Sequence, residues 1–125
     1  MKTSIFLFLG TFLVSFSVAH AQDKLPKKKR ELKMYLIERD IPNAGQFSSE
    51  ELQSISQTSC DVLDEMDPKE IKWIESYVTD DKIYCRYWAK NEELLRDHAE
   101  KGEFPITKII LIHNKIDSST ADVKS

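Results

Sequence analysis

His98 is the side chain in this chain whose chemistry is best suited to binding a transition metal. It lies in a predicted short helix, where a rotation of 100° per residue places it between Leu94 and Leu95 on the apolar stripe. An imidazole there is either a core side chain satisfied by a hydrogen bond, or a nitrogen ligand for nickel, copper or zinc. The acidic residues next to it in the sequence face other directions, so the helix alone has no metal-binding motif.

A second group of candidates lies in the segment WIESYVTDDKIYCRYWA, residues 73–89. Asp80 and Asp81 are typical of a two-residue hairpin loop, and cross-strand partners share a face of the sheet. One predicted face carries Ile74, Ser76, Val78, Ile83, Cys85 and Tyr87, and the other carries Trp73, Glu75, Tyr77, Tyr84, Arg86 and Trp88. The first set resembles ordinary core. In the second set the opposed Glu75 and Arg86 are either an interface ion pair or the polar anchor of an aromatic-lined pocket.

Glu38, near the end of the first predicted strand, is a further oxygen donor that either reaches a metal or remains in water. Cys60 and Cys85 lie on different predicted elements, so their spacing leaves a disulfide open. The serines fall at a helix cap or along a helix, and the chain has only three glycines, too few for a phosphate-binding loop. The sequence therefore predicts no catalytic residues and no enzyme activity.

The segments that must position these residues alternate between two hydrophobic patterns: apolar residues at every second position, typical of strands, and apolar residues at helical spacing. We predict strands at 32–39, 70–79, 82–89 and 108–116, and helices at 49–66 and 92–101. Ser48 and Glu51 form a capping-box pattern at the first helix, Asn91 caps the second, and Gly102 suits the left-handed position after it. The order predicts an α+β, ferredoxin-like βαββαβ sandwich, with a four-stranded antiparallel sheet and two helices on one face.

In this fold the hairpin face with the four aromatic side chains is left open by the monomer. Such a patch is larger than soluble monomers usually expose. We therefore predict that a second copy of the chain covers it, in a two-fold homodimer with the two sheets face to face. The residues at this predicted interface or pocket are Trp73, Tyr77, Tyr84, Arg86 and Trp88.

The N-terminus has the layout of a secretory signal peptide, with Lys2, an apolar run and an A-x-A site that ends at Ala21. The run is short for a membrane span, so we predict cleavage after Ala21 and a periplasmic or secreted protein with no stable membrane anchor. The alternative is an uncleaved N-terminal anchor. The predicted organisation is a signal peptide at 1–21, a flexible basic linker at 22–32, a domain at 33–117 and a polar tail at 118–125.

The domain itself is acidic. From Met34 onward there are 11 Lys and Arg against 19 Asp and Glu. This balance argues against nucleic acid as a partner, because binding to nucleic acid depends on neutralising phosphates.

Several segments together resemble the small nickel-responsive, nickel-binding proteins. They are YLIERDIPNAG (35–45), SSEEL (48–52), SYVTDDKIYCRYWA (76–89), NEELLRDHAEKGEFP (91–105) and ID (116–117). The resemblance covers about 33–120 and implies a dimeric ferredoxin-like fold with a role in binding nickel. Many members have Gly-Gly where this chain has Gly102-Glu103, and the signal peptide differs from members that work in the cytoplasm.

The sequence thus predicts an exported dimer that binds a transition metal ion, nickel according to the resemblance, without catalytic turnover. His98 is the predicted nitrogen ligand, and Glu38 and Glu75 are candidate oxygen ligands or partners of the ligands. Two alternatives remain. One is a dimeric α/β-barrel enzyme, similar to small monooxygenases or isomerases, with a pocket beside Trp73, Tyr84 and Arg86. The other is a purely structural interaction dimer.

Overall fold

The computed structural model describes residues 31–122, and these residues form the predicted α+β, ferredoxin-like fold. The strands are β1 (Lys33–Asp40), β2 (Ile71–Val78), β3 (Lys82–Ala89) and β4 (Lys108–Ile112); the α-helices are α2 (Ser49–Asp64) and α3 (Glu92–Gly102); and the 3-10 helices are η3 (Ala44–Gln46) and η4 (Ser118–Asp122). The predicted signal peptide, most of the basic linker and the last three residues lie outside the described residues.

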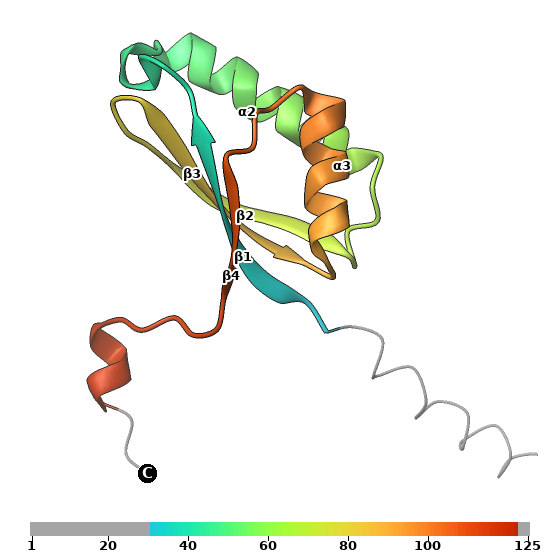
Figure 1. The fold of residues 1–125 in the computed structure, drawn as a ribbon, viewed down its shortest axis with the longest axis vertical. Helices are drawn as coiled ribbons and strands as arrows, with labels where there is room; N and C mark the ends of the chain where they lie inside the picture. The colour runs from blue at the N-terminus through green and yellow to red at the C-terminus, as the bar shows by residue number, and fades with distance from the viewer. Residues whose placement is uncertain (1–30, 123–125) are drawn as a thin grey trace, which may run out of the picture. The chain divides into compact units, whose positions relative to one another are not determined.

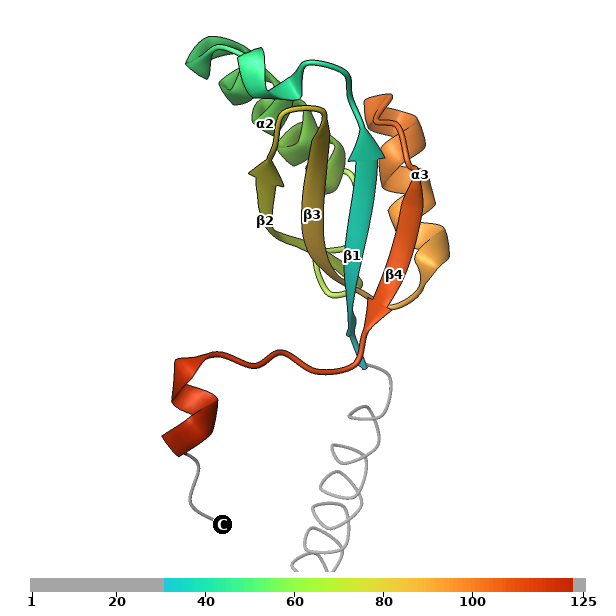
Figure 2. The same cartoon turned by 60° about the vertical axis from the view of Figure 1, so that its left-hand side comes forward.

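The four strands form one antiparallel sheet in the order β2-β3-β1-β4. Both α-helices lie on the same side of this sheet, as Figures 1 and 2 show from two directions. Residues that alternate along the two central strands therefore point either under the helices or away from them. The core on the helix side includes Ile37, Tyr87 and Leu95, each with 2% or less of its surface exposed.

The helix starts follow the predicted capping chemistry. The Ser48 hydroxyl accepts a hydrogen bond from the Glu51 backbone N–H at 3.1 Å, and the Glu51 carboxylate accepts one from the Ser48 N–H at 3.1 Å. The Asn91 side chain accepts a bond from the Leu94 N–H at 3.0 Å. Both caps satisfy amide groups that would otherwise lack partners at the start of each helix.

The end of α3 differs from the prediction. Glu103, at φ 58°, adopts the left-handed conformation that we predicted for Gly102, which is instead the last residue of the helix. A Cβ atom on Gly102 would lie 2.3 Å from the ring of Phe104. Any larger residue there would require the Phe104 ring to move, because the ring folds back over the helix end. This position brings Phe104 next to His98.

The predicted register of the hairpin is right near its turn and wrong beyond Glu75. Glu75 pairs with Arg86 and Tyr77 with Tyr84, as predicted, but a β-bulge between Trp73 and Glu75 places Trp73 opposite Tyr87. A bulge places two residues of one strand opposite one residue of its partner, so the simple alternation fails there. Trp73 consequently lies on the helix side of the sheet, not on the open face.

The last strand is shorter than predicted. β4 pairs with β1 from Glu38↔Lys108 to Met34↔Ile112, and β1 itself begins at Lys33. The residues after Ile112 therefore have almost no partner strand left, and Ile116 is 79% exposed. None of the helices within residues 31–122 combines the length and hydrophobicity that a membrane crossing requires.

Candidate functional site

His98 lies in the core and is not accessible to solvent. It is 0% exposed, and its Nε2 atom lies 3.1 Å from the hydroxyl oxygen of Ser59 on α2. The ring centroids of Tyr87 and Phe104 are each 5.5 Å from that of His98. The Nδ1 atom is buried without a hydrogen-bond partner among the described residues.

The electrostatic surroundings of His98 disfavour a cation. Burial, together with the positive charge of Arg39, lowers the pKa of His98 to about 4. The imidazole is therefore neutral at neutral pH, which is the form that binds metals. A metal ion bound to His98 would, however, lose its water and lie near the positively charged guanidinium of Arg39, and both effects are unfavourable. These surroundings do not fit His98 as the predicted nitrogen ligand.

The two predicted carboxylate ligands lie on the open face of the sheet, opposite His98. The strand pairings arrange this face in rows: Tyr77, Tyr84, Glu38 and Lys108 form one, and Glu75, Arg86, Leu36 and Ile110 form the next. Glu38 on β1 and Glu75 on β2 are separated by β3, so their backbones are roughly 10 Å apart. The fold therefore does not bring His98, Glu38 and Glu75 together within one subunit.

Each of these carboxylates has a cationic partner. The Lys82 ammonium lies 3.1 Å from Glu38 and 2.8 Å from Asp40. The hydrogen bond from Lys82 is the main reason that the pKa of Asp40 is lowered, and the bonds from Asp40 and Glu38 raise the pKa of Lys82. Residues 31–122 contain no group of three or more His, Cys, Asp or Glu side chains placed to hold one metal ion.

The open face also exposes large apolar side chains. Tyr77 is 49% exposed, Ile110 43% and Trp88 38%. Among them lies Arg86, whose Nη2 atom is 3.2 Å from Glu75 and whose Nη1 atom donates to the Met34 sulfur at 3.8 Å. The helices lie behind the sheet in Figure 2, and no other described element covers this face. Within one subunit it is an unpartnered surface with charged residues on it.

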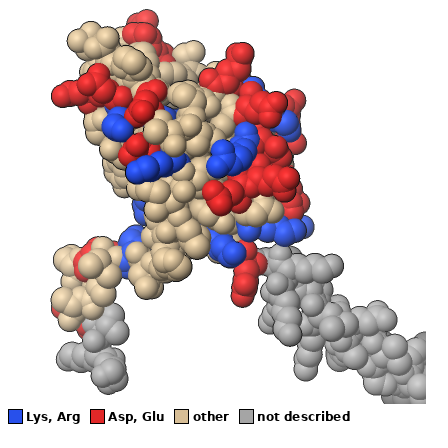
Figure 3. Space-filling model, viewed as in Figure 1, with Lys and Arg blue, Asp and Glu red and all other residues tan. Residues whose placement is uncertain are grey.

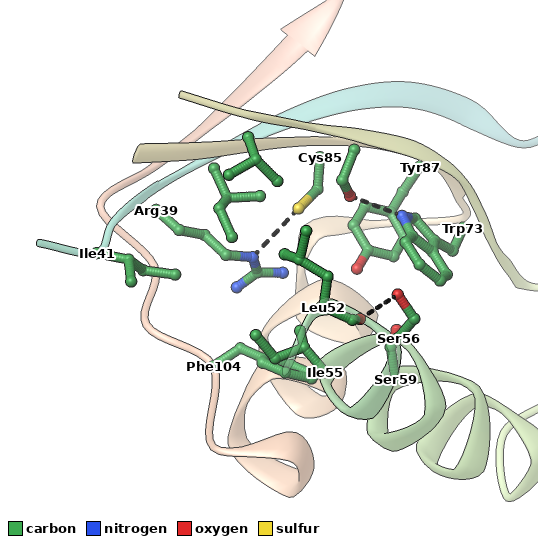
Figure 4. A pocket seen from close by; sticks show the side chains of 13 residues that line it. Arg39, Ile41, Leu52, Ile55, Ser56, Ser59, Trp73, Cys85, Tyr87 and Phe104 are labelled. Carbon is green, nitrogen blue, oxygen red and sulfur yellow. Dashed lines mark hydrogen bonds between the residues drawn. The ribbon is translucent and has the colours of Figure 1, made fainter. Parts of the chain in front are cut away.

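The predicted enzyme pocket beside Trp73, Tyr84 and Arg86 does not form within one subunit. The bulge places Trp73 on the helix side, and Tyr84 and Arg86 point away from the helices. Trp73 instead lines a cavity between α2 and the sheet, where its indole N–H donates to Ser76 at 2.8 Å (Figure 4).

Arg39 also lines this cavity, and it is not among the site residues predicted from the sequence. It follows Tyr35 and Ile37 at alternate positions of β1, so strand alternation alone would have placed it on the buried face.

The two cysteines are free thiols in very different environments. Cys60 is exposed on α2, whereas Cys85 is 4% exposed on β3 and accepts a hydrogen bond from Arg39 Nε at 3.4 Å.

We expect an aromatic disulfide reagent to modify one thiol per chain in the folded protein, and the second only after unfolding, because burial blocks access. The release of the coloured thiolate measures both phases. Cys60→Ser should remove the fast phase, and fast modification of Cys85 would contradict the expectation.

The surface charge follows the acidic composition of the domain. In the view of Figure 3, acidic side chains outnumber basic ones and several gather over α3. Helix α3 contributes Glu92, Glu93, Asp97 and Glu100.

Comparisons with known proteins give a family and a fold. The family model described as "Nickel responsive protein SCO4226-like" matches residues 35–112. The crystal structure of SCO4226 from Streptomyces coelicolor A3(2) is similar, with a TM-score of 0.57 and 12% sequence identity. That match covers 66% of this chain and 99% of the other chain, and at this identity it shows the fold alone. No curated protein sequence matches the chain significantly.

Proposed function

The chain belongs to the SCO4226-like family of nickel-responsive proteins, and from this premise we propose that it is an exported homodimer that binds nickel without catalysing a reaction. The observation that carries the proposal is the open sheet face, where exposed apolar side chains surround paired charges. Removing apolar surface of this kind from water lowers the free energy and so favours association. A second copy related by two-fold symmetry presents the same apolar surface. It brings no unpaired charge from Glu75 or Arg86, because this pair remains neutralised within its own subunit.

The nickel ligands in this proposal come from the margin of the open face. Glu38 and Asp40 already place two carboxylates around one cation, the Lys82 ammonium, and a metal ion would compete with that ammonium. One subunit provides too few ligands, and a dimer doubles the set that meets at the interface. Nickel also favours imidazole. Of the two histidines in residues 31–122, His113 is the exposed one. It borders a groove with Trp88 and Met34, at the opposite end of the same face from Glu38, so in this proposal His113 of the partner subunit would approach Glu38.

Calorimetric titration with nickel tests this assignment, using protein purified after expression of the full chain. We expect Glu38→Gln to weaken nickel binding by about tenfold or more, since losing a ligand or its supporting group has effects of this order. Asp64→Asn is the matched control, because it removes an exposed carboxylate on α2, on the other side of the sheet. His113→Gln should also weaken binding, whereas His98→Gln should leave the stoichiometry unchanged.

Two further measurements complete the test. Light scattering should give a mass near twice that of one chain, and a monomer with and without nickel would refute the dimer. Mass spectrometry of protein recovered from the periplasm or medium should give an N-terminus at Gln22. If Glu38→Gln binds nickel as tightly as Asp64→Asn does, the ligands lie elsewhere and the proposed site is wrong.

A further inference from the structure

The guanidinium of Arg39 is a buried positive charge without a counterion. Arg39 is 3% exposed, and its Nη1 atom donates to the Pro105 carbonyl at 2.8 Å while its Nε atom donates to the Cys85 sulfur. Its Nη2 atom is buried without a partner, and none of the ion pairs among residues 31–122 includes it. Arginine does not lose its proton in proteins, so the side chain cannot become neutral. The charge is left with two neutral acceptors, the neighbouring hydroxyl of Tyr87 and the face of the Phe104 ring, 5.4 Å away.

This charge lies at a cavity between α2 and the sheet. The guanidinium points into the cavity toward Leu52 and Ile55 of α2 (Figure 4). Most other lining side chains are apolar, and no Asp or Glu is among them. The hydroxyls of Ser56, Ser59 and Ser76 are already paired, with the Leu52 carbonyl, His98 and Trp73 respectively. Nη2 of Arg39 is thus a hydrogen-bond donor at this cavity that still lacks a partner.

We propose that this cavity is a binding site for a small organic anion, a monocarboxylate with an apolar body, whose carboxylate pairs with Arg39. The carboxylate would accept hydrogen bonds from the guanidinium, as arginine forks bind planar anions. The apolar body would lie against Leu52, Ile55 and Trp73. Val78, at the end of β2, lines the cavity and is 41% exposed.

The size and charge of the cavity narrow the class of ligand. Its volume is about 80 Å³, which at about 30 Å³ for each water in the liquid corresponds to roughly three waters. A carboxylate with a short alkyl chain, such as butanoate, has about this size, whereas a cavity that holds a benzene ring has about 150 Å³. Burial is the main reason that the pKa of Tyr87 is raised to about 12, so its hydroxyl in the cavity wall remains protonated and neutral. A metal cation finds no carboxylate here, so this site is distinct from the proposed nickel site.

Calorimetry and thermal melting without nickel test the proposal, with propanoate and butanoate as probes and their amides as neutral analogues. We expect each carboxylate to bind saturably and to raise the melting temperature. The amides should bind at least about tenfold more weakly, because they leave the guanidinium unpaired. The indole fluorescence of Trp73 gives an independent signal, since it lines the cavity whereas Trp88 lies on the other face.

Two variants test the positive charge of Arg39 and the volume of the cavity separately. Arg39→Met should abolish carboxylate binding while the protein stays folded, because it replaces an unpaired charge with an apolar chain of similar length. Should that variant unfold, Ser56→Leu serves instead, since it fills the cavity from the half-buried surface of α2 and leaves Arg39 in place. Equal binding of acids and amides, no binding at about 10 mM of either acid, or unchanged binding by Ser56→Leu would overturn the proposal. Binding of chloride or sulfate as tight as that of butanoate would overturn the assigned ligand class.

Discussion

Leu95→Ala is expected to lower the free energy of unfolding by about 3 kcal/mol, since Leu-to-Ala changes at buried sites cost about 2 to 5 kcal/mol. Leu95 is 0% exposed and packs from α3 into the main core cluster. Its truncation removes apolar contacts and leaves a cavity that neither the sheet nor the helix backbone can close. The melting temperature should fall by roughly 12 to 24 °C, at about 4 to 8 °C per kcal/mol for a domain of this size.

Leu94→Ala is the matched control for this prediction. It makes the same chemical change in the same helix, and therefore the same small change in helix propensity. Leu94 is only partly buried at the edge of the core, so we expect a clearly smaller loss. Denaturant unfolding at constant slope measures both values. Equal losses for the two variants would show that α3 does not pack on the sheet through Leu95.

The fold could be predicted because its signals are local and agree with one another. The serine and glutamate of the capping box, the asparagine before α3 and the Asp80-Asp81 turn each determine a boundary through bonds made within a few residues. Alternation along β1 and β3 then determines which side chains lie under the helices. These features depend on backbone geometry, which the nearby sequence largely dictates.

The bulge at Ile74 could not be predicted in this way. No glycine or other turn-prone residue marks it in the sequence, and it arises from the pairing of β2 with β3 as a whole. One extra residue transfers Trp73 from the open face to the cavity under α2. Trp73 is therefore absent from the predicted aromatic face and lines the cavity instead.

The candidate sites depend on contacts that are distant in the sequence. Arg39 lies next to Cys85, Phe104 and Pro105 only because β1, β3 and the segment after α3 meet at the same end of the sheet. His98 was predicted on the apolar stripe of its helix, and it does lie there. Its surroundings could not be predicted from the sequence, since the cation of Arg39, which disfavours a second cation nearby, is 59 positions away.

The burial of His98 makes the stability of the protein depend on pH. Because the pKa of His98 is about 4 in the folded chain and about 6.5 in an unfolded one, the unfolded state binds more protons between these values. The free energy of unfolding is therefore highest above about pH 6.5 and falls as the pH decreases toward 4. The loss amounts to about 3 kcal/mol, at about 1.4 kcal/mol for each pH unit that separates the two pKa values.

Comparison of His98→Gln with His113→Gln isolates this effect. Both variants lose one histidine and keep every carboxylate, so acid titration of Asp and Glu contributes equally to the two curves. His113 is exposed, and its removal should leave the fall in stability between about pH 6.5 and 4 unchanged. His98→Gln should be less stable at neutral pH but should lose about 3 kcal/mol less over the same range. Two curves of equal slope would mean that the pKa of His98 in the folded protein is close to its value in the unfolded chain, and would contradict the prediction.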